Sequence, residues 1–166
     1  MYKITKVFVI SIAIILSTGC ASMSKPKRTA YTGADSVGAA TPEMLIGNWS
    51  VKALNPAEGE NTTESKASFK SDGTVTINVT PNTSPNPMGT IALEMTGDWS
   101  IEGDYVVQQL KSIRETSGNK MASMIVGMMG SMKEKMGGKS NIYEASADRV
   151  VFVSDDGQAQ ELIRIQ

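Results

Sequence analysis

Apolar and polar side chains alternate with a period of two along most of residues 43–166, and this pattern limits the fold more than any other feature. Alternation of this kind places successive side chains on opposite faces of a β-strand. The pattern is clearest in residues 74–80 and 91–101, where most apolar positions are separated by single polar residues. The side chains that we expect to point inward from these segments are Val75, Ile77, Ile91, Leu93 and Met95.

Turn sequences divide the same region into eight predicted strands. Asp72-Gly73 and Glu102-Gly103 are signals for tight turns. Gly97 stands at a position where the alternation of its segment would place an apolar residue, and this predicts a β-bulge. Eight consecutive antiparallel strands with one apolar face are best closed into an up-and-down barrel, because closure leaves no unpaired edge. The predicted strands are residues 46–53, 66–70, 74–80, 91–101, 104–112, 141–146, 149–154 and 159–165.

A methionine-rich helix is predicted between the fifth and sixth strands. Six of the 11 methionines lie in residues 121–136, at spacings that place them on one helical face. Asn119 is expected to cap the start of this helix and Gly137-Gly138 to end it. Two internal glycines weaken the helix, so it needs a partner surface. The predicted apolar face consists of Met121, Met124, Ile125, Met128, Met129, Met132 and Met136.

Four roles of this helix remain open at the level of sequence. It plugs the barrel mouth with its methionines as core, or it forms a mobile lid over an apolar ligand, since thioether side chains repack around variable shapes. An excess of lysine over residues 120–139 is also typical of a helix that lies on a membrane. Thioethers favour Cu(I) as well. The residues that would form such a copper site are Met124, Met128, Met132 and Met136.

The first 20 residues have the organisation of a bacterial lipoprotein leader. Lys3 and Lys6 precede an apolar run over residues 7–16, which is too short to span a bilayer. The run is followed by Ser17-Thr18-Gly19-Cys20, which resembles a lipobox. The resemblance implies that residues 1–19 are a signal peptide and that Cys20 carries the lipid. With Ala21 next, it further implies an outer-membrane anchor in the cell envelope, with the barrel facing the periplasm or the cell surface.

Residues 20–42 are expected to be the lipidated cysteine and a flexible tether, because they are small and polar and have no apolar period. The barrel domain then covers residues 43–166. The connections after the second, fourth and sixth strands are tight, whereas those after the first, third and fifth are long. Because successive connections of a meander lie at opposite ends, the tight turns share one end of the barrel and the long connections share the other. The chain enters its first strand from the tight-turn end. We therefore expect the tether to place that end toward the membrane.

Several short motifs resemble those of the lipocalins. Gly47-Asn48-Trp49 is similar to the Gly-x-Trp signature of the first lipocalin strand, and residues 161–164 resemble the closing strand. The resemblance covers about residues 43–112 and 140–166. It implies an eight-stranded barrel that often holds an apolar ligand. It also implies that Gly47, Trp49 and Arg164 have a structural role at the barrel base, where the arginine packs near the tryptophan.

Composition excludes several classes of function. The chain has no histidine and one cysteine, and its net charge is −1. It therefore lacks the most common general base and the basic surface that nucleic-acid binding requires. We predict no enzymatic activity, no cofactor and no metal site of the usual kind. We predict a membrane-anchored lipoprotein whose barrel binds a small hydrophobic ligand or an acyl chain beneath the methionine-rich helix. The alternative is a filled barrel that binds another envelope component, and Cu(I) binding is a lesser alternative.

Overall fold

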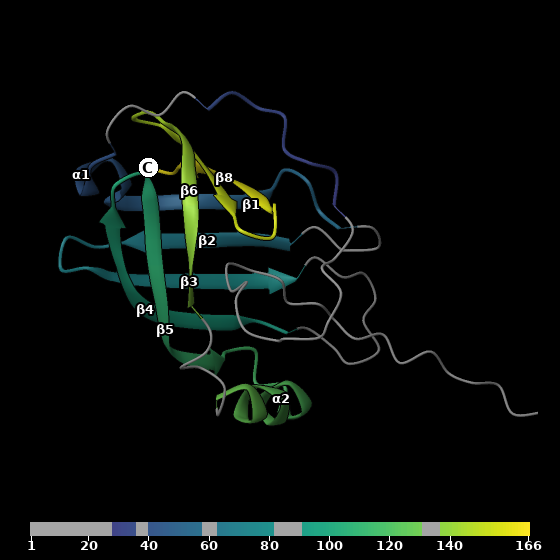
Figure 1. Cartoon of the computed structure of the whole chain (residues 1–166). Coiled ribbons are helices and arrows are strands. Elements are labelled where there is room, and N and C mark those ends of the chain that lie inside the picture. The colour runs from purple at the N-terminus through teal and green to yellow at the C-terminus, as the bar shows by residue number, and fades with distance from the viewer. Residues whose placement is uncertain (1–27, 36–39, 58–62, 82–90, 131–136) are drawn as a thin grey trace, which may run out of the picture.

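A computed structural model of the chain describes residues 28–35, 40–57, 63–81, 91–130 and 137–166. A short helix precedes eight strands, and a second helix lies between the fifth and sixth strands (Figure 1). The elements are α1 (Pro42–Leu45), β1 (Gly47–Ala53), β2 (Thr63–Phe69), β3 (Thr74–Pro81), β4 (Leu93–Glu102), β5 (Tyr105–Glu115), α2 (Lys120–Gly130), β6 (Gly137–Ala145), β7 (Arg149–Ser154) and β8 (Ala159–Arg164).

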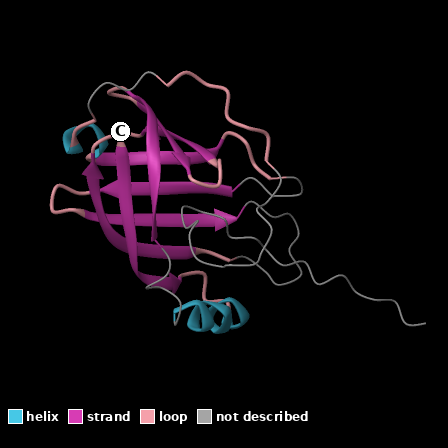
Figure 2. Ribbon diagram, viewed as in Figure 1, coloured by secondary structure: helices cyan, strands magenta, loops and turns pink. Residues whose placement is uncertain are grey.

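The eight strands form a closed antiparallel barrel in the order of the sequence, with β8 paired to β1 (Figure 2). This confirms the predicted fold class. The turns after β2, β4 and β6, together with α1, lie at one end, which we call the turn end. The opposite end, where β1, β3, β5 and β7 finish, is called the loop end. α2 is described over Lys120–Gly130 and β6 begins at Gly137, so the predicted end of the helix before Gly137-Gly138 falls at residues 131–136, which lie outside the described part of the chain.

The predicted bulge occurs at Gly97. The β4–β5 register shifts between Thr96 and Gly97, and Gly97 then lies opposite Leu110. A Cβ atom on Gly97 would lie 2.3 Å from the carbonyl oxygen of Gln109, which belongs to the backbone of β5. Only glycine fits there without separating the two strands, so this residue lets the long strand β4 bend around the barrel.

The turn end is closed by an interaction between the first and last strands. The Trp49 side chain is fully buried, and its indole N–H donates a hydrogen bond to the carbonyl of Leu45 at 2.7 Å. The Arg164 guanidinium carbon lies 4.1 Å from the Trp49 ring centroid. The same guanidinium donates hydrogen bonds to the carbonyls of Ile46 and Met44 in and after α1. One cationic side chain therefore joins β8 to β1 and to the helix that covers the barrel base.

Replacing Gly97 by alanine is expected to destabilise the barrel by about 2–3 kcal/mol, because the new methyl group meets the backbone of β5. Urea unfolding followed by tryptophan fluorescence measures this. Gly127→Ala is the matched control, because a Cβ there would meet nothing within 4 Å and the helix would gain up to about 1 kcal/mol. Equal stabilities for the two variants would contradict the bulge as described.

Candidate functional site

The barrel interior is lined mainly by apolar side chains. The predicted inward residues of β3 and β4, and the residues just before β4, all belong to the buried core and are at most 8% exposed. These residues are Val75, Ile77, Ile91, Leu93 and Met95. Polar side chains interrupt this lining at Ser65, Gln108 and Gln160, which are also buried. The polar interior positions, rather than the apolar ones, are therefore the candidates for fixing the orientation of a ligand.

Gln108 is the most informative of these positions. It lies between Val106 and Leu110 on the inward face of β5 and is 6% exposed. Within the described structure, its side-chain Nε2 is buried and has no hydrogen-bond partner. Leaving a buried donor unpaired costs about 1–3 kcal/mol. Gln108 was not predicted from the sequence, although it alternates with the apolar residues Val106 and Leu110, and this spacing could have placed it inside the barrel.

The register of the barrel places an aromatic residue and a glycine beside Gln108. In the register of the barrel, Gln108 is opposite Trp99 of β4 on one side and Gly138 of β6 on the other. Residues directly opposite each other in an antiparallel pair point to the same face. Trp99 is buried against Phe69 in an edge-to-face contact, whereas Gly138 contributes no side chain. The described β5–β6 pairing ends one residue further along, at Gln109 and Gly137.

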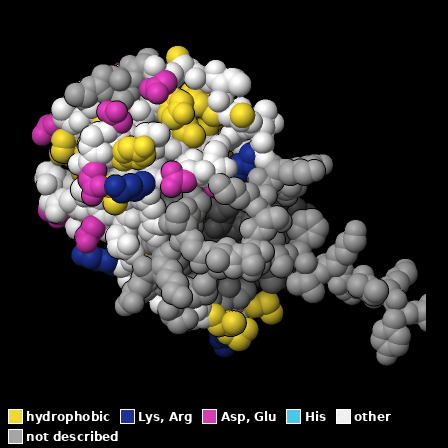
Figure 3. All heavy atoms as spheres, viewed as in Figure 1, with side chains coloured by type: hydrophobic (Ala, Val, Ile, Leu, Met, Phe, Trp, Pro, Cys, Tyr) yellow, Lys and Arg dark blue, Asp and Glu magenta, His cyan; other side chains and the backbone are white. Residues whose placement is uncertain are grey.

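Helix α2 presents three of its methionines to the outside. Asn119 caps the helix as predicted, since its side-chain oxygen accepts hydrogen bonds from the N–H groups of Met121 and Ala122. The residues buried toward the barrel are Ala122 and Val126, at 3% and 9% exposure. In contrast, the exposed fractions of three methionines are 52%, 63% and 70%. These three residues are Met121, Met124 and Met128. Figure 3 shows hydrophobic side chains gathered on the surface at the lower edge, where α2 lies.

Met121, Met124 and Met128 are therefore not core residues, which removes the plug interpretation for these three side chains. Ala122 and Val126 are four positions apart, so they form one narrow stripe that packs on the barrel. Short side chains allow the helix to approach β5 closely, and the longer methionines occupy the remaining faces. We name the exposed set of Met121, Met124 and Met128 the methionine face.

Several predicted residues lie outside the described part of the chain. They are the signal peptide, Cys20, Met132 and Met136, and the side chains of Ile125 and Met129. Only two of the four methionines of the suggested Cu(I) site are therefore described. The described residues hold no group of three or more His, Cys, Asp or Glu side chains that could bind a metal ion. Within the same residues, neither helix has the length and apolar character needed to cross a membrane.

Residues 28–35, which we call the strap, are held against the outer wall of the barrel. At its start, the Asn55 side-chain amide donates hydrogen bonds of 2.8 Å to the carbonyls of Thr29 and Gly157. The Asn55 side-chain oxygen accepts a hydrogen bond from the N–H of Ala159. Arg28 forms an ion pair with Asp156, and its side chain is only 4% exposed. The start of the strap is thus fixed where β1 ends and β8 begins, at the loop end.

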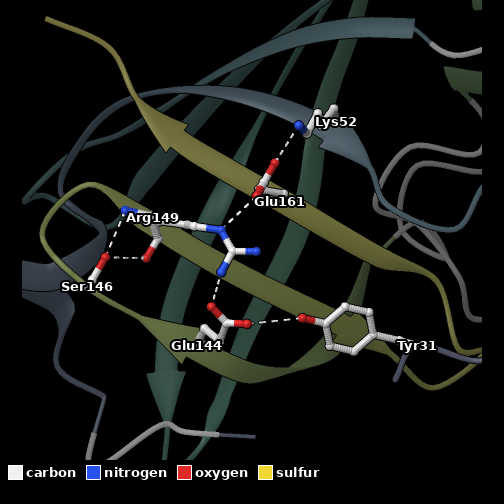
Figure 4. A network of polar contacts seen from close by, with 6 residues as sticks. All are labelled: Tyr31, Lys52, Glu144, Ser146, Arg149 and Glu161. Atoms are coloured by element: carbon white, nitrogen blue, oxygen red, sulfur yellow. Dashed lines mark hydrogen bonds and ion pairs between the residues drawn. The ribbon is translucent and has the colours of Figure 1, made fainter. Parts of the chain in front are cut away.

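Further along, the strap reaches a row of polar side chains on the outside of four strands (Figure 4). Tyr31 donates a hydrogen bond to Glu144 on β6, and its ring contacts Tyr143 edge-on. Arg149 on β7 binds both Glu144 and Glu161. Lys52 on β1 completes the row with a 2.7 Å ion pair to Glu161.

The contacts in this row shift the pKa values of Glu161 and Arg149. The hydrogen bond from Lys52, together with that from Arg149, lowers the pKa of Glu161 even though burial opposes the shift. The hydrogen bond to Glu161 in turn raises the pKa of Arg149. Glu161 points outward yet is only 7% exposed, and Val151 beside it is fully buried. Val151 is opposite Glu144, whose carboxylate accepts the hydrogen bond from Tyr31 of the strap.

The strap changes two expectations about residues 20–42. Its contacts differ from those of a flexible tether, because residues 28–35 are fixed by side chains of the barrel. The strap also begins at the loop end, and its course over residues 28–35 is directed toward the side of the turn end (Figure 1). The chain before residue 28 therefore emerges at the loop end, opposite to the end expected from where β1 begins.

Replacing Glu161 by glutamine tests the polar row. A lowered pKa means that the carboxylate stabilises the fold above its ordinary pKa, and that this stability is lost as the pH falls through the lowered value. We expect Glu161→Gln to cost about 1–2 kcal/mol near neutral pH. The cost should be smaller in acid, once the pH has fallen through the lowered pKa and the wild-type carboxyl has taken up a proton.

Urea unfolding near neutral pH and in acid gives this comparison. Glu94→Gln is the control for loss of one negative charge, because Glu94 pairs with Arg114 on the exposed surface, where ion pairs contribute little. An undiminished cost of Glu161→Gln in acid would show that the charge of Glu161 is irrelevant to stability.

Comparison with known proteins gives a likeness of fold only. No protein-family model matches the chain, and no curated protein sequence matches it. Among solved structures, it is similar to a lipocalin-like protein from Bacteroides uniformis ATCC 8492, with 11% identity and a TM-score of 0.43 over 74% of this chain and 99% of that one. It is also similar to a redesigned β-barrel, with 15% identity and a TM-score of 0.39 over 75% and 95% of the respective chains. The assignment of a closed eight-stranded barrel stands on the strand pairing of this chain itself.

Proposed function

We propose that this chain is a lipid-anchored protein of the bacterial cell envelope whose barrel binds a small amphipathic molecule. The unpaired Gln108 donor inside the barrel is the observation that carries the ligand proposal. The lipid anchor rests on the lipobox-like sequence that ends in Cys20. Export to the outer membrane is part of the same proposal.

The chemistry around Gln108 indicates the class of ligand. Its free group is a neutral donor, so it suits an acceptor such as an ester, ketone or amide carbonyl. An ionised group is disfavoured, because a buried charge without a counter-charge is costly. The surrounding side chains, including Trp99, Val106 and Leu110, are buried and mainly apolar. An acyl chain that carries a neutral carbonyl group combines both requirements.

Replacing Gln108 by leucine tests the proposal, because it removes the donor and keeps a similar volume. The chain from Ala21 to Gln166 contains every described contact and can be studied without the lipid. Native mass spectrometry of this protein, purified from bacteria, should show an added mass that is released as an apolar compound on denaturation. We expect the affinity for that compound to fall about tenfold in Gln108→Leu, the value of one hydrogen bond.

Two further measurements make the result decisive. Gln109→Leu alters the exposed face of the same strand and should leave the affinity unchanged. The ligand-free Gln108→Leu protein should unfold at a higher urea concentration than the wild type, because the unpaired donor is gone. A bare protein mass, together with no binding of an added fatty-acid methyl ester, would instead favour a filled barrel that binds an envelope partner.

A further inference from the structure

We propose that the loop end of the barrel and the methionine face of α2 rest on the membrane surface. This inference depends on the proposed lipid anchor at Cys20, and it does not depend on a ligand in the barrel. It assigns one partner to an exposed apolar surface, namely a phospholipid bilayer. Three features of the protein support this inference: the position of the start of the strap, the length of chain between the strap and Cys20, and the position of the methionine face.

The strap determines where the anchor chain leaves the barrel. Thr29 is bound by Asn55, and Asn55 also binds Gly157 and Ala159 of the barrel wall. All of these residues lie where β1 ends or β8 begins, which is the loop end. The chain that runs back from Arg28 toward Cys20 therefore starts at the loop end, whatever path it takes.

The remaining chain is short compared with the barrel. Only the seven residues 21–27 separate Cys20 from Arg28. As a flexible chain they span roughly 15 Å, and fully extended they reach about 27 Å. The 10 residues of β4 are about 33 Å long at 3.3 Å per residue. The anchor thus holds the loop end close to the bilayer, and the turn end is out of its usual reach.

The methionine face lies at the same end of the barrel. Helix α2 follows β5, which finishes at the loop end, and in Figure 1 it is on the other side of the barrel from the strap. Met121, Met124 and Met128 are more than half exposed, while Ala122 and Val126 pack on the barrel. An exposed apolar cluster of this kind marks an interaction site.

Charge supports a lipid surface as the partner. Lys25 and Lys27 lie in the seven-residue segment next to Cys20, and Lys120 is exposed at the start of α2. Lysine side chains near an anionic membrane surface are attracted to it. The lipid at Cys20 and the methionine face then form two contacts on opposite sides of the barrel mouth. Two contacts fix an orientation, which a single flexible anchor does not.

The orientation can be measured on the full, processed lipoprotein in vesicles of phosphatidylethanolamine and phosphatidylglycerol. An environment-sensitive fluorophore is attached to a cysteine introduced as Met124→Cys on the methionine face, or as Ser71→Cys in the β2–β3 turn at the turn end. Because Cys20 carries the lipid, it does not compete for the label. We expect quenching by brominated lipid to be several-fold larger at position 124 than at position 71.

A pair of insertions tests the role of the strap. A flexible Gly-Ser segment of about 20 residues between Lys25 and Pro26 lengthens the free anchor chain and should reduce quenching at position 124. The same segment between Ser36 and Val37 follows the strap and should leave the quenching unchanged. Equal effects of the two insertions would overturn the role given to the strap.

The outcomes also separate this inference from the proposed anchor. If the protein lacks a diacylglycerol mass and does not float with vesicles, the anchor proposal fails first. If it floats and position 71 is quenched more than position 124, the turn end faces the membrane and the inference is wrong. If it floats and neither position is quenched, the methionine face does not bind lipid, and a protein partner takes its place.

Discussion

The pairing of β1 with β8 is the constraint on which the other features of this structure depend. It closes the sheet and thereby determines which side chains of every strand point inward. Arg164 reinforces this closure, because its guanidinium covers the buried Trp49 ring and binds the backbone around α1. The same closure places Gln108 among apolar side chains and turns Glu161 and Val151 outward. Both the candidate ligand site and the outer wall to which the strap binds therefore follow from one strand pairing.

The sequence predicts the barrel well because each strand has its own alternation of apolar and polar residues, and Gly97 marks the bulge by standing at an apolar position of that alternation. The sequence does not predict which face of the helix packs on the barrel, and the reason is physical. Periodicity shows that residues 120–130 have distinct faces, but it does not show which face packs on the barrel. The methionines are the most apolar candidates, yet a close approach to β5 selects the short side chains of Ala122 and Val126.

The strap and Gln108 were missed because their partners are distant in sequence. Residues 28–35 have no apolar period, and the contact between Tyr31 and Glu144 joins residues 113 positions apart. An unpaired donor is also a property of surroundings rather than of a residue. Gln108 is informative because its buried Nε2 has no hydrogen-bond partner in the described structure, and its neighbour in β6, Gly138, has no side chain that could supply one. No local pattern contains that information.

The unpaired donor of Gln108 has a consequence for how long the protein survives in the cell. A ligand that binds the folded state stabilises it, and it does so more when it also satisfies a buried group that is otherwise unpaired. The empty barrel would open more often than the filled one, and proteases act on the opened state. Under the proposed function, the abundance of the protein would then follow the supply of its ligand, through degradation and without any change in synthesis.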